Sequence, residues 1–263
     1  MALALAVVIA LITIISTVLF AAKYWWMPAL ASAHGGAIDQ QIVLTMVITG
    51  VIFLAAQLGL AFVILRYRGR GQTASYLHGN NRLEVIWTAA TAVLFIGLNL
   101  MGQHVWAERH FRPAADDALK IEVVGQQFVW NIRYAGADGQ FGRTDVQFVD
   151  DAAGNPLGID PEDPAGKDDI VVPTMAVPLN RQVEILLRSK DVTHSFFVRE
   201  LRVKQDAVPG MVIPLHFVAT APGNFEIVCA ELCGLGHHKM RSFIEILPEE
   251  DYQKWLQERA VPN

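Results

Sequence analysis

The distribution of charge over the first 107 residues constrains this chain most. Three long segments there, residues 2–22, 41–65 and 85–107, contain no Asp, Glu, Lys or Arg. A helix needs about 20 apolar residues to cross the roughly 30 Å hydrocarbon core of a bilayer, so each segment is long enough to span it. Only 18% of the whole chain is charged, and its mean hydropathy is +0.31. These values favour a membrane protein over a soluble one.

The connections between these segments predict the orientation of the spans. The connection between the second and third segments carries four arginines and no acid from residue 66 to 83: Arg66, Arg68, Arg70 and Arg82. The connection from 23 to 40 holds only Lys23 and Asp39 as charged residues. Because positively charged connections stay in the cytoplasm, the second span runs inward and the third outward. Everything after about residue 107 is then on the outer, periplasmic side, and Tyr24, Trp25 and Trp26 fall at the outer interface.

The first segment has two interpretations. The small residues from Ala29 to Ala33 follow an apolar run and suit cleavage by a signal peptidase, which would remove residues 1–33 or a part of them. Against cleavage, no basic residue precedes the run, the run is long for a signal core, and aromatic residues follow it. We therefore favour an extra N-terminal helix in addition to a helical hairpin.

The rest of the chain, residues 108–263, is predicted to be a separate outer domain made mainly of strands. Residues 107–263 carry 16 basic and 24 acidic side chains, whereas residues 1–106 carry 5 and 2. An acidic domain is unsuited to nucleic acid and suits a basic protein partner. Short strands with Gly and Pro turns between them suggest a β-sandwich or Greek-key barrel; the β-rich runs are 120–134, 182–188, 211–219, 225–229 and 242–247. We expect a Gly-, Pro- and Asp-rich loop at 150–169 and a terminal helix at Pro248–Arg259.

A cluster of metal-ligand residues lies near the end of this domain. Residues 229–240 read CAELCGLGHHKM, which places Cys229, Cys233, His237 and Met240 at spacings of four, four and three, and His194 lies 35 residues before Cys229. Thiolate, imidazole and thioether ligands together select copper. Zinc would accept the two Cys and two His, but it has no use for Met240.

The second cysteine separates this pattern from a mononuclear blue copper site, which uses one Cys, two His and a weak axial Met. Two bridging thiolates can hold two coppers. Cys229 and Cys233 would each bridge both metals, and His194 and His237 would bind one each. Met240 and the main-chain oxygen of Glu231 would be the weak ligands. A site with every position filled by protein carries electrons and does not bind oxygen.

Simpler interpretations exist for the same residues. Two cysteines in an oxidising compartment can form a disulfide, and His194 alone could be a hydrogen-bonded core histidine. The other histidines show no ligand spacing and are interpreted as ordinary polar residues: His34, His78, His104, His110, His216 and His238.

Two segments together resemble a known family. DVTHSFFVRELRVKQDAVPG (191–210) and CAELCGLGHHKM (229–240) are similar to subunit 2 of haem-copper cytochrome c oxidases, which carries a dinuclear copper centre called copper A. The resemblance also covers Arg82–Thr88 and a strand around Gln126–Trp130. It implies a helical hairpin followed by a cupredoxin-like β-barrel, and it makes His194, Cys229, Glu231, Cys233, His237 and Met240 the copper ligands.

The resemblance also implies partners and further roles. The side chain of Glu231 would face a magnesium or manganese ion at the interface with oxidase subunit 1, and Glu84 would lie near the mouth of a proton channel in that subunit. The chain would accept electrons from cytochrome c and pass them to haem in subunit 1, where oxygen is reduced to water and protons are translocated. Further oxidase subunits would join the complex. The chain would thus be one part of an enzyme.

The chain departs from the family at one strand. The family has Trp-Tyr-Trp where this sequence has Phe128, Val129 and Trp130, and the first Trp is where electrons enter. Phe128 and Trp130 are therefore the candidates for accepting electrons. No C-x-x-C-H motif for haem attachment is present, so the donor is expected to be a separate cytochrome c or cytochrome c domain.

Several alternatives stay open at this point. A membrane-tethered copper-binding protein or chaperone would use the same soft ligands, and the copper A subunit of a nitric oxide reductase would differ only in its terminal acceptor. Glu84 could simply extend to the membrane surface at a helix start. The acidic loop 150–169 could be solvated, or it could attract a basic cytochrome c.

Overall fold

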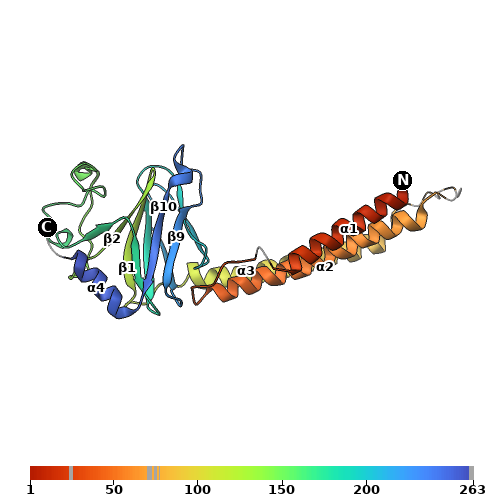
Figure 1. The fold of residues 1–263 in the computed structure, drawn as a ribbon, viewed down its shortest axis with the longest axis horizontal. Coiled ribbons are helices and arrows are strands. Elements are labelled where there is room, and N and C mark those ends of the chain that lie inside the picture. The colour runs from red at the N-terminus through yellow and green to blue at the C-terminus, as the bar shows by residue number, and fades with distance from the viewer. Residues whose placement is uncertain (24–25, 70–72, 74–75, 77, 261–263) are drawn as a thin grey trace. The chain divides into compact units, whose positions relative to one another are not determined.

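The three apolar segments form α-helices in the computed structural model, which describes residues 1–23, 26–69, 73, 76 and 78–260 (Figure 1). These helices are α1 (Ala2–Ala21), α2 (Gly35–Tyr67) and α3 (Asn81–His110), and all three are long and apolar enough to cross a membrane. α3 begins before its charge-free segment because Asn80 accepts hydrogen bonds from the N–H groups of Arg82 and Leu83 at the first turn. Of the residues discussed above, Tyr24, Trp25 and Arg70 lie outside the described part.

The chain divides into two compact units, each made of two separate stretches of sequence. One contains Met1–Met27 and Ala37–Trp106, and the other contains Pro28–Gly36 and Ala107–Asn263. A short segment between α1 and α2 therefore belongs to the outer unit, which the sequence had not indicated.

The outer unit contains two five-stranded sheets (Figure 1). Their orders are β3-β2-β1-β5-β8 and β4-β10-β9-β6-β7. Pairing is antiparallel except for β1 with β5 and β10 with β4, which are parallel. The strands are β1 (Leu119–Gln126), β2 (Val129–Tyr134), β3 (Ile170–Val172), β4 (Met175–Pro178), β5 (Gln182–Ser189), β6 (His194–Val198), β7 (Val203–Ala207), β8 (Ile213–Val218), β9 (Gly223–Cys229) and β10 (Arg241–Leu247).

One hydrophobic core is formed by residues of both sheets, so they pack as a sandwich. In β5 the buried positions alternate, and Val183, Ile185 and Leu187 point into the core. Ile244 and Ile246 of β10 contribute from the other sheet. The terminal helix α4 (Glu249–Arg259) buries Tyr252 and Trp255 on the same core.

The expected strand around Gln126–Trp130 is wrong. β1 ends at Gln126 and β2 begins at Val129, and these two residues face each other across an antiparallel pair. Gln127 and Phe128 form the two-residue turn of a β-hairpin. The β-rich composition of 120–134 suits both arms of a hairpin, and no Gly or Asn marks the turn between them, so the sequence reads as one long strand.

The outer face of this hairpin is covered by the loop between β2 and β3. Glu122 and Arg133 face each other across β1 and β2 and are both buried. The Arg133 guanidinium donates to the carboxylates of Glu122 and Asp169 and to the carbonyl of Gly142. The acidic segment 150–169 lies within this loop and is made of turns and one short 3-10 helix, Pro164–Gly166.

Candidate metal centre

The expected ligands come from the ends of neighbouring strands. His194 begins β6 and Cys229 ends β9, and these two strands pair with each other. The chain then forms a loop through Cys233 and the short 3-10 helix His237–Lys239 before β10 begins. The N–H of Cys229 donates to the carbonyl of Met240 at 3.1 Å, which closes this loop at its base. Strand pairing thus brings together residues that lie 35 positions apart.

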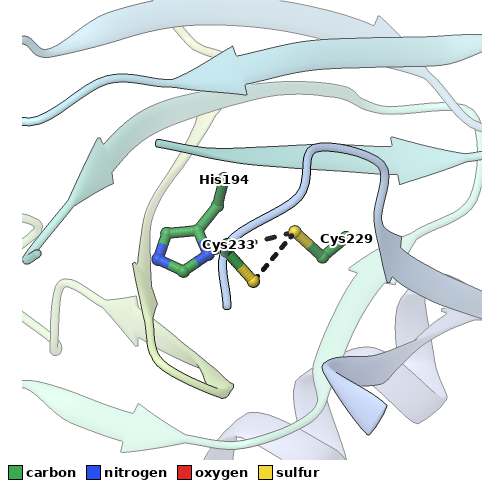
Figure 2. Close-up of side chains that lie close together, drawn as sticks. All are labelled: His194, Cys229 and Cys233. Carbon is green, nitrogen blue, oxygen red and sulfur yellow. Dashed lines mark hydrogen bonds between the residues drawn. The ribbon is translucent and has the colours of Figure 1, made fainter. Parts of the chain in front are cut away.

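Four donor atoms surround the sulfur atoms of the two cysteines, which makes six donor atoms in all. The Sγ of Cys229 lies 3.9 Å from Nδ1 of His194, 3.2 Å from the carbonyl oxygen of Glu231 and 3.8 Å from the Sγ of Cys233. The Sγ of Cys233 lies 3.5 Å from Nδ1 of His237 and 3.7 Å from Sδ of Met240. Figure 2 shows His194, Cys229 and Cys233 pointing toward one another, and their ligand atoms lie within 4.8 Å of one another.

These separations fit a metal better than a disulfide. A disulfide holds its sulfur atoms about 2.0 Å apart, so the 3.8 Å here means two free thiols. Two ligands placed about 2.3 Å from a shared ion in tetrahedral geometry are themselves about 3.8 Å apart. The donor set, with thiolates, imidazoles and a thioether, is the soft set that copper prefers.

Burial keeps the Cys233 thiol neutral without a metal. His194 is fully buried, and Cys229, Cys233 and Met240 are buried as well. Burial, followed by the neighbouring Cys229, raises the pKa of the Cys233 thiol to about 11. A metal ion that binds here must therefore displace the proton of the Cys233 thiol.

Asp191 orients the histidine ligand, and sequence reasoning missed it. Its Oδ1 lies 2.8 Å from Nε2 of His194, so the other ring nitrogen, Nδ1, faces Cys229. A carboxylate on the far nitrogen is the usual way to fix the tautomer and orientation of a metal-binding histidine. Burial tends to raise the pKa of Asp191, but hydrogen bonds from the Gln127 N–H, the His194 ring and the Val192 N–H leave it lowered. The D-x-x-H spacing was the signal that could have found this residue.

Both aromatic candidates for electron transfer lie beside the centre. The ring of Trp130 is buried and meets the His194 ring edge to face, with centroids 6.0 Å apart. Phe128 lies against the ligand loop, where a side chain at Gly236 would overlap its ring. Phe128 therefore contacts the cysteine loop, and Trp130 contacts His194.

Other predicted residues lie outside the cluster. The side chain of Glu231 is exposed, so only its carbonyl oxygen takes part. His238, next to His237, is also exposed. Glu84 lies in the first turn of α3, in the other compact unit.

Comparison with known proteins identifies the family. The family model described as "Cytochrome C oxidase subunit II, periplasmic domain" matches residues 119–247. A protein of Bradyrhizobium diazoefficiens named "Alternative cytochrome c oxidase subunit 2" is 36% identical over 261 residues, which cover 98% of this chain and 92% of that protein. The chain belongs to the cytochrome c oxidase subunit 2 family.

Two further relatives are less similar in sequence. "Cytochrome c oxidase subunit 2" of Synechocystis sp. is 28% identical over 255 residues, covering 89% of this chain and 76% of that protein. A solved structure, the periplasmic domain of subunit II of cytochrome oxidase of Bradyrhizobium japonicum, is 25% identical with a TM-score of 0.39, and covers 56% of this chain and 95% of that one.

Proposed function

We propose that this chain is subunit 2 of a haem-copper cytochrome c oxidase. It would accept electrons from a cytochrome c on the outer face and pass them to haem in subunit 1, where oxygen is reduced to water and protons are translocated. The observation that carries this proposal is the convergence of Cys, His and Met donors on two free thiols in a member of this family. The names of the relatives do not favour a nitric oxide reductase or a copper chaperone.

Six residues would hold a dinuclear copper: His194, Cys229, Glu231 through its carbonyl, Cys233, His237 and Met240. When bound, the copper pair would supply a one-electron carrier. The protein excludes water from the site because His194, both thiols and Met240 are buried. Asp191 keeps Nδ1 of His194 facing Cys229, and both thiols must release their protons on loading.

The wider architecture supports the same assignment. We propose that residues 1–107 form a three-span membrane anchor and that 108–263 form a periplasmic cupredoxin-like domain with a C-terminal helix. Two packed sheets with the site at strand ends support a cupredoxin-like barrel. We assign electron acceptance to Phe128 and Trp130 because both contact the ligand segments.

The anchor and the exposed surface suggest further roles toward other subunits. Glu84 would take up protons at the cytoplasmic end of α3. The exposed carboxylate of Glu231 would be available to a magnesium or manganese ion held with subunit 1. The acidic loop 150–169, with seven acids and one Lys, would attract a basic, separate cytochrome c.

Copper loading of the full chain tests the proposed function. The detergent-purified chain is reconstituted with copper, and copper content and the electron paramagnetic resonance (EPR) spectrum of the oxidised form are measured. Two coppers per chain, with hyperfine structure from one electron shared by two nuclei, are expected. A single copper with a mononuclear spectrum, or copper that a chelator removes readily, would contradict it. The double variant Cys229→Ser with Cys233→Ser is the control and should not retain copper.

A further inference from the structure

The end of β1 and the turn that follows it touch both halves of the metal centre. On the histidine side, Gly125 leaves no room for a side chain, since a Cβ there would lie 2.8 Å from Cδ2 of His194. On the cysteine side, a Cβ at Gly234 would lie 2.8 Å from Nε2 of Gln127. The turn is at least 66 residues from any proposed ligand in the sequence (Phe128 to His194), so only the fold brings it there.

Gln127 makes one hydrogen bond to each side. Its backbone N–H donates to Oδ2 of Asp191 at 2.7 Å, and Asp191 in turn holds His194. Its side-chain amide donates to the carbonyl oxygen of Cys233 at 2.6 Å. A continuous chain of hydrogen bonds therefore runs from Cys233 through Gln127 and Asp191 to His194.

We infer that Gln127 is a positioning residue that fixes the cysteine loop relative to His194. The loop needs an external support because Gly234, next to Cys233, has a φ of +134°, a conformation that few other residues adopt. The amide of Gln127 reaches the loop at the residue before this glycine. Without it, the Cys233 carbonyl would be free to turn away and the donor atoms would separate. The effect on copper binding rests on the proposed function, whereas the hydrogen bond between Gln127 and Cys233 does not.

The variant Gln127→Glu tests the side-chain bond, because it keeps the size of the side chain and replaces the donor with an acceptor that faces the Cys233 carbonyl. The backbone bond to Asp191 is unaffected. Gln140→Glu is the matched control, since Gln140 is an exposed glutamine on the loop that follows β2. Both variants are made in the full chain in detergent.

Two readouts separate this inference from the proposed function. In the metal-free chain, amide hydrogen exchange of residues 230–240 should be faster in Gln127→Glu than in the wild type and Gln140→Glu. After loading, the chelator should remove copper about 10-fold faster, and the copper hyperfine pattern should change, because lost support around ligands weakens metal binding about 10- to 100-fold. Unchanged exchange would overturn the inference, as would changed exchange with unchanged copper release and spectrum. Failure of the wild type to bind copper would instead refute the proposed function.

A separate observation concerns the segment between α1 and α2. Residues 28–34 lie along the outer unit and form backbone hydrogen bonds with it. The N–H of Ala31 donates to the carbonyl of Glu200 at 2.8 Å, and the carbonyl of Ala31 accepts from Thr220 at 2.9 Å. The N–H of Ala33 donates to Val218 at 3.0 Å, and Ser32 forms an antiparallel bridge with Ala219. We call residues 28–34 the strap.

Side-chain contacts hold the strap in addition to its backbone hydrogen bonds. Ala31 and Ser32 are buried, and the Ser32 hydroxyl donates to the carbonyl of Leu201 at 2.7 Å. Arg202 has a left-handed φ of 55° and donates from Nη2 to the carbonyl of Pro28 at 2.7 Å. At the end of the strap, a side chain on Gly35 would overlap Leu30.

We propose that the mature protein keeps the strap, and that the run Ala29–Ala33 is not a processing site. Cleavage after Ala31 or Ala33 would remove the residues that fill this part of the outer unit and leave the carbonyl of Glu200 without its strap partner.

The N-terminus of the mature chain decides the matter. The full chain is produced in a bacterium that exports and processes signal peptides, purified from membranes, and examined by intact mass and N-terminal sequencing. The expected N-terminus lies at or before Pro28, so that the whole strap is present. An N-terminus at Ser32 or His34 would overturn the proposal.

Discussion

At the scale of single residues, Met240 is the ligand whose loss should alter the centre without emptying it. In Met240→Leu, two Cys and two His remain, so two coppers should still bind. Loss of a weak electron donor destabilises the oxidised form, so the reduction potential should rise and the EPR spectrum should change. The exposed Met211, changed to Leu, is the control. Potentiometry that finds the two variants identical would remove Met240 from the ligand set.

The Cys233 thiol should be unreactive in the metal-free chain at neutral pH. Its pKa is raised to about 11, chiefly by burial, and only the thiolate reacts with iodoacetamide. The rate of alkylation at Cys233 should therefore rise about tenfold per pH unit up to about pH 11. Peptide mass spectrometry over a pH series measures this. A rate that levels off near pH 8 or 9 would show an ordinary thiol.

The proposed ligands could be predicted from sequence, whereas the contact of Gln127 with their loop could not. Cys229, Cys233, His237 and Met240 share one short loop, and their spacing shows their chemistry directly. Gln127 reaches this loop from 106 residues away, and the contact exists only because β1 and β2 turn beside β9 and β6. Long-range hydrogen bonds leave no periodic signal in a single sequence.

At the scale of elements, Arg133 should hold the β2–β3 loop on the sheet. Its side chain is 1% exposed and pairs with the buried carboxylates of Glu122 and Asp169. Arg133→Met leaves the Asp169 carboxylate buried without its charged partner, whereas Glu122 keeps its ion pair with Arg188. Removing one partner of a buried pair costs about 3–5 kcal/mol. Arg143→Met is the control, because Arg143 is 74% exposed where it pairs with Asp160, and such pairs contribute about 1 kcal/mol or less. Chemical denaturation monitored by tryptophan fluorescence should separate the two variants. Equal losses of stability would show that Arg133 does not hold the loop on the sheet.

The strap should be sensitive to the size of its buried side chain. Ala31 is buried against the outer unit, so Ala31→Leu should overpack it and lower the free energy of unfolding by about 1–3 kcal/mol. The exposed Ala29, two residues earlier, gives the matched control, and Ala29→Leu should change stability by about 0.5 kcal/mol or less. Denaturation curves of the two variants in detergent provide the comparison. A similar small effect in both would mean that the strap is not held.

Strands were predictable where they are long and alternating, and missed where they are short or interrupted. β8 falls within a predicted run, and β5, β9 and β10 overlap predicted runs and extend one or two residues beyond them. β3 and β4 have only three and four residues, and β7 carries the polar run Lys204–Asp206. β6 begins at a ligand, so its sequence was interpreted for chemistry rather than for pairing. These strands form because they complete the two sheets and bury the core, not because their local sequence requires it.

At the scale of the whole molecule, the arginines between α2 and α3 should decide which side of the membrane the metal centre faces. Arg66, Arg68, Arg70 and Arg82 are unopposed by acids from residue 66 to 83, and positive connections stay in the cytoplasm. Green fluorescent protein fused after Thr73 should therefore fluoresce, and alkaline phosphatase fused after Ala260 should be active. Replacing the four arginines with alanine should reduce both signals, whereas Lys120→Ala, in the outer unit, should not. No fluorescence from the fusion after Thr73, with no phosphatase activity from the fusion after Ala260, would place the centre inside the cell, where it could not meet a periplasmic donor.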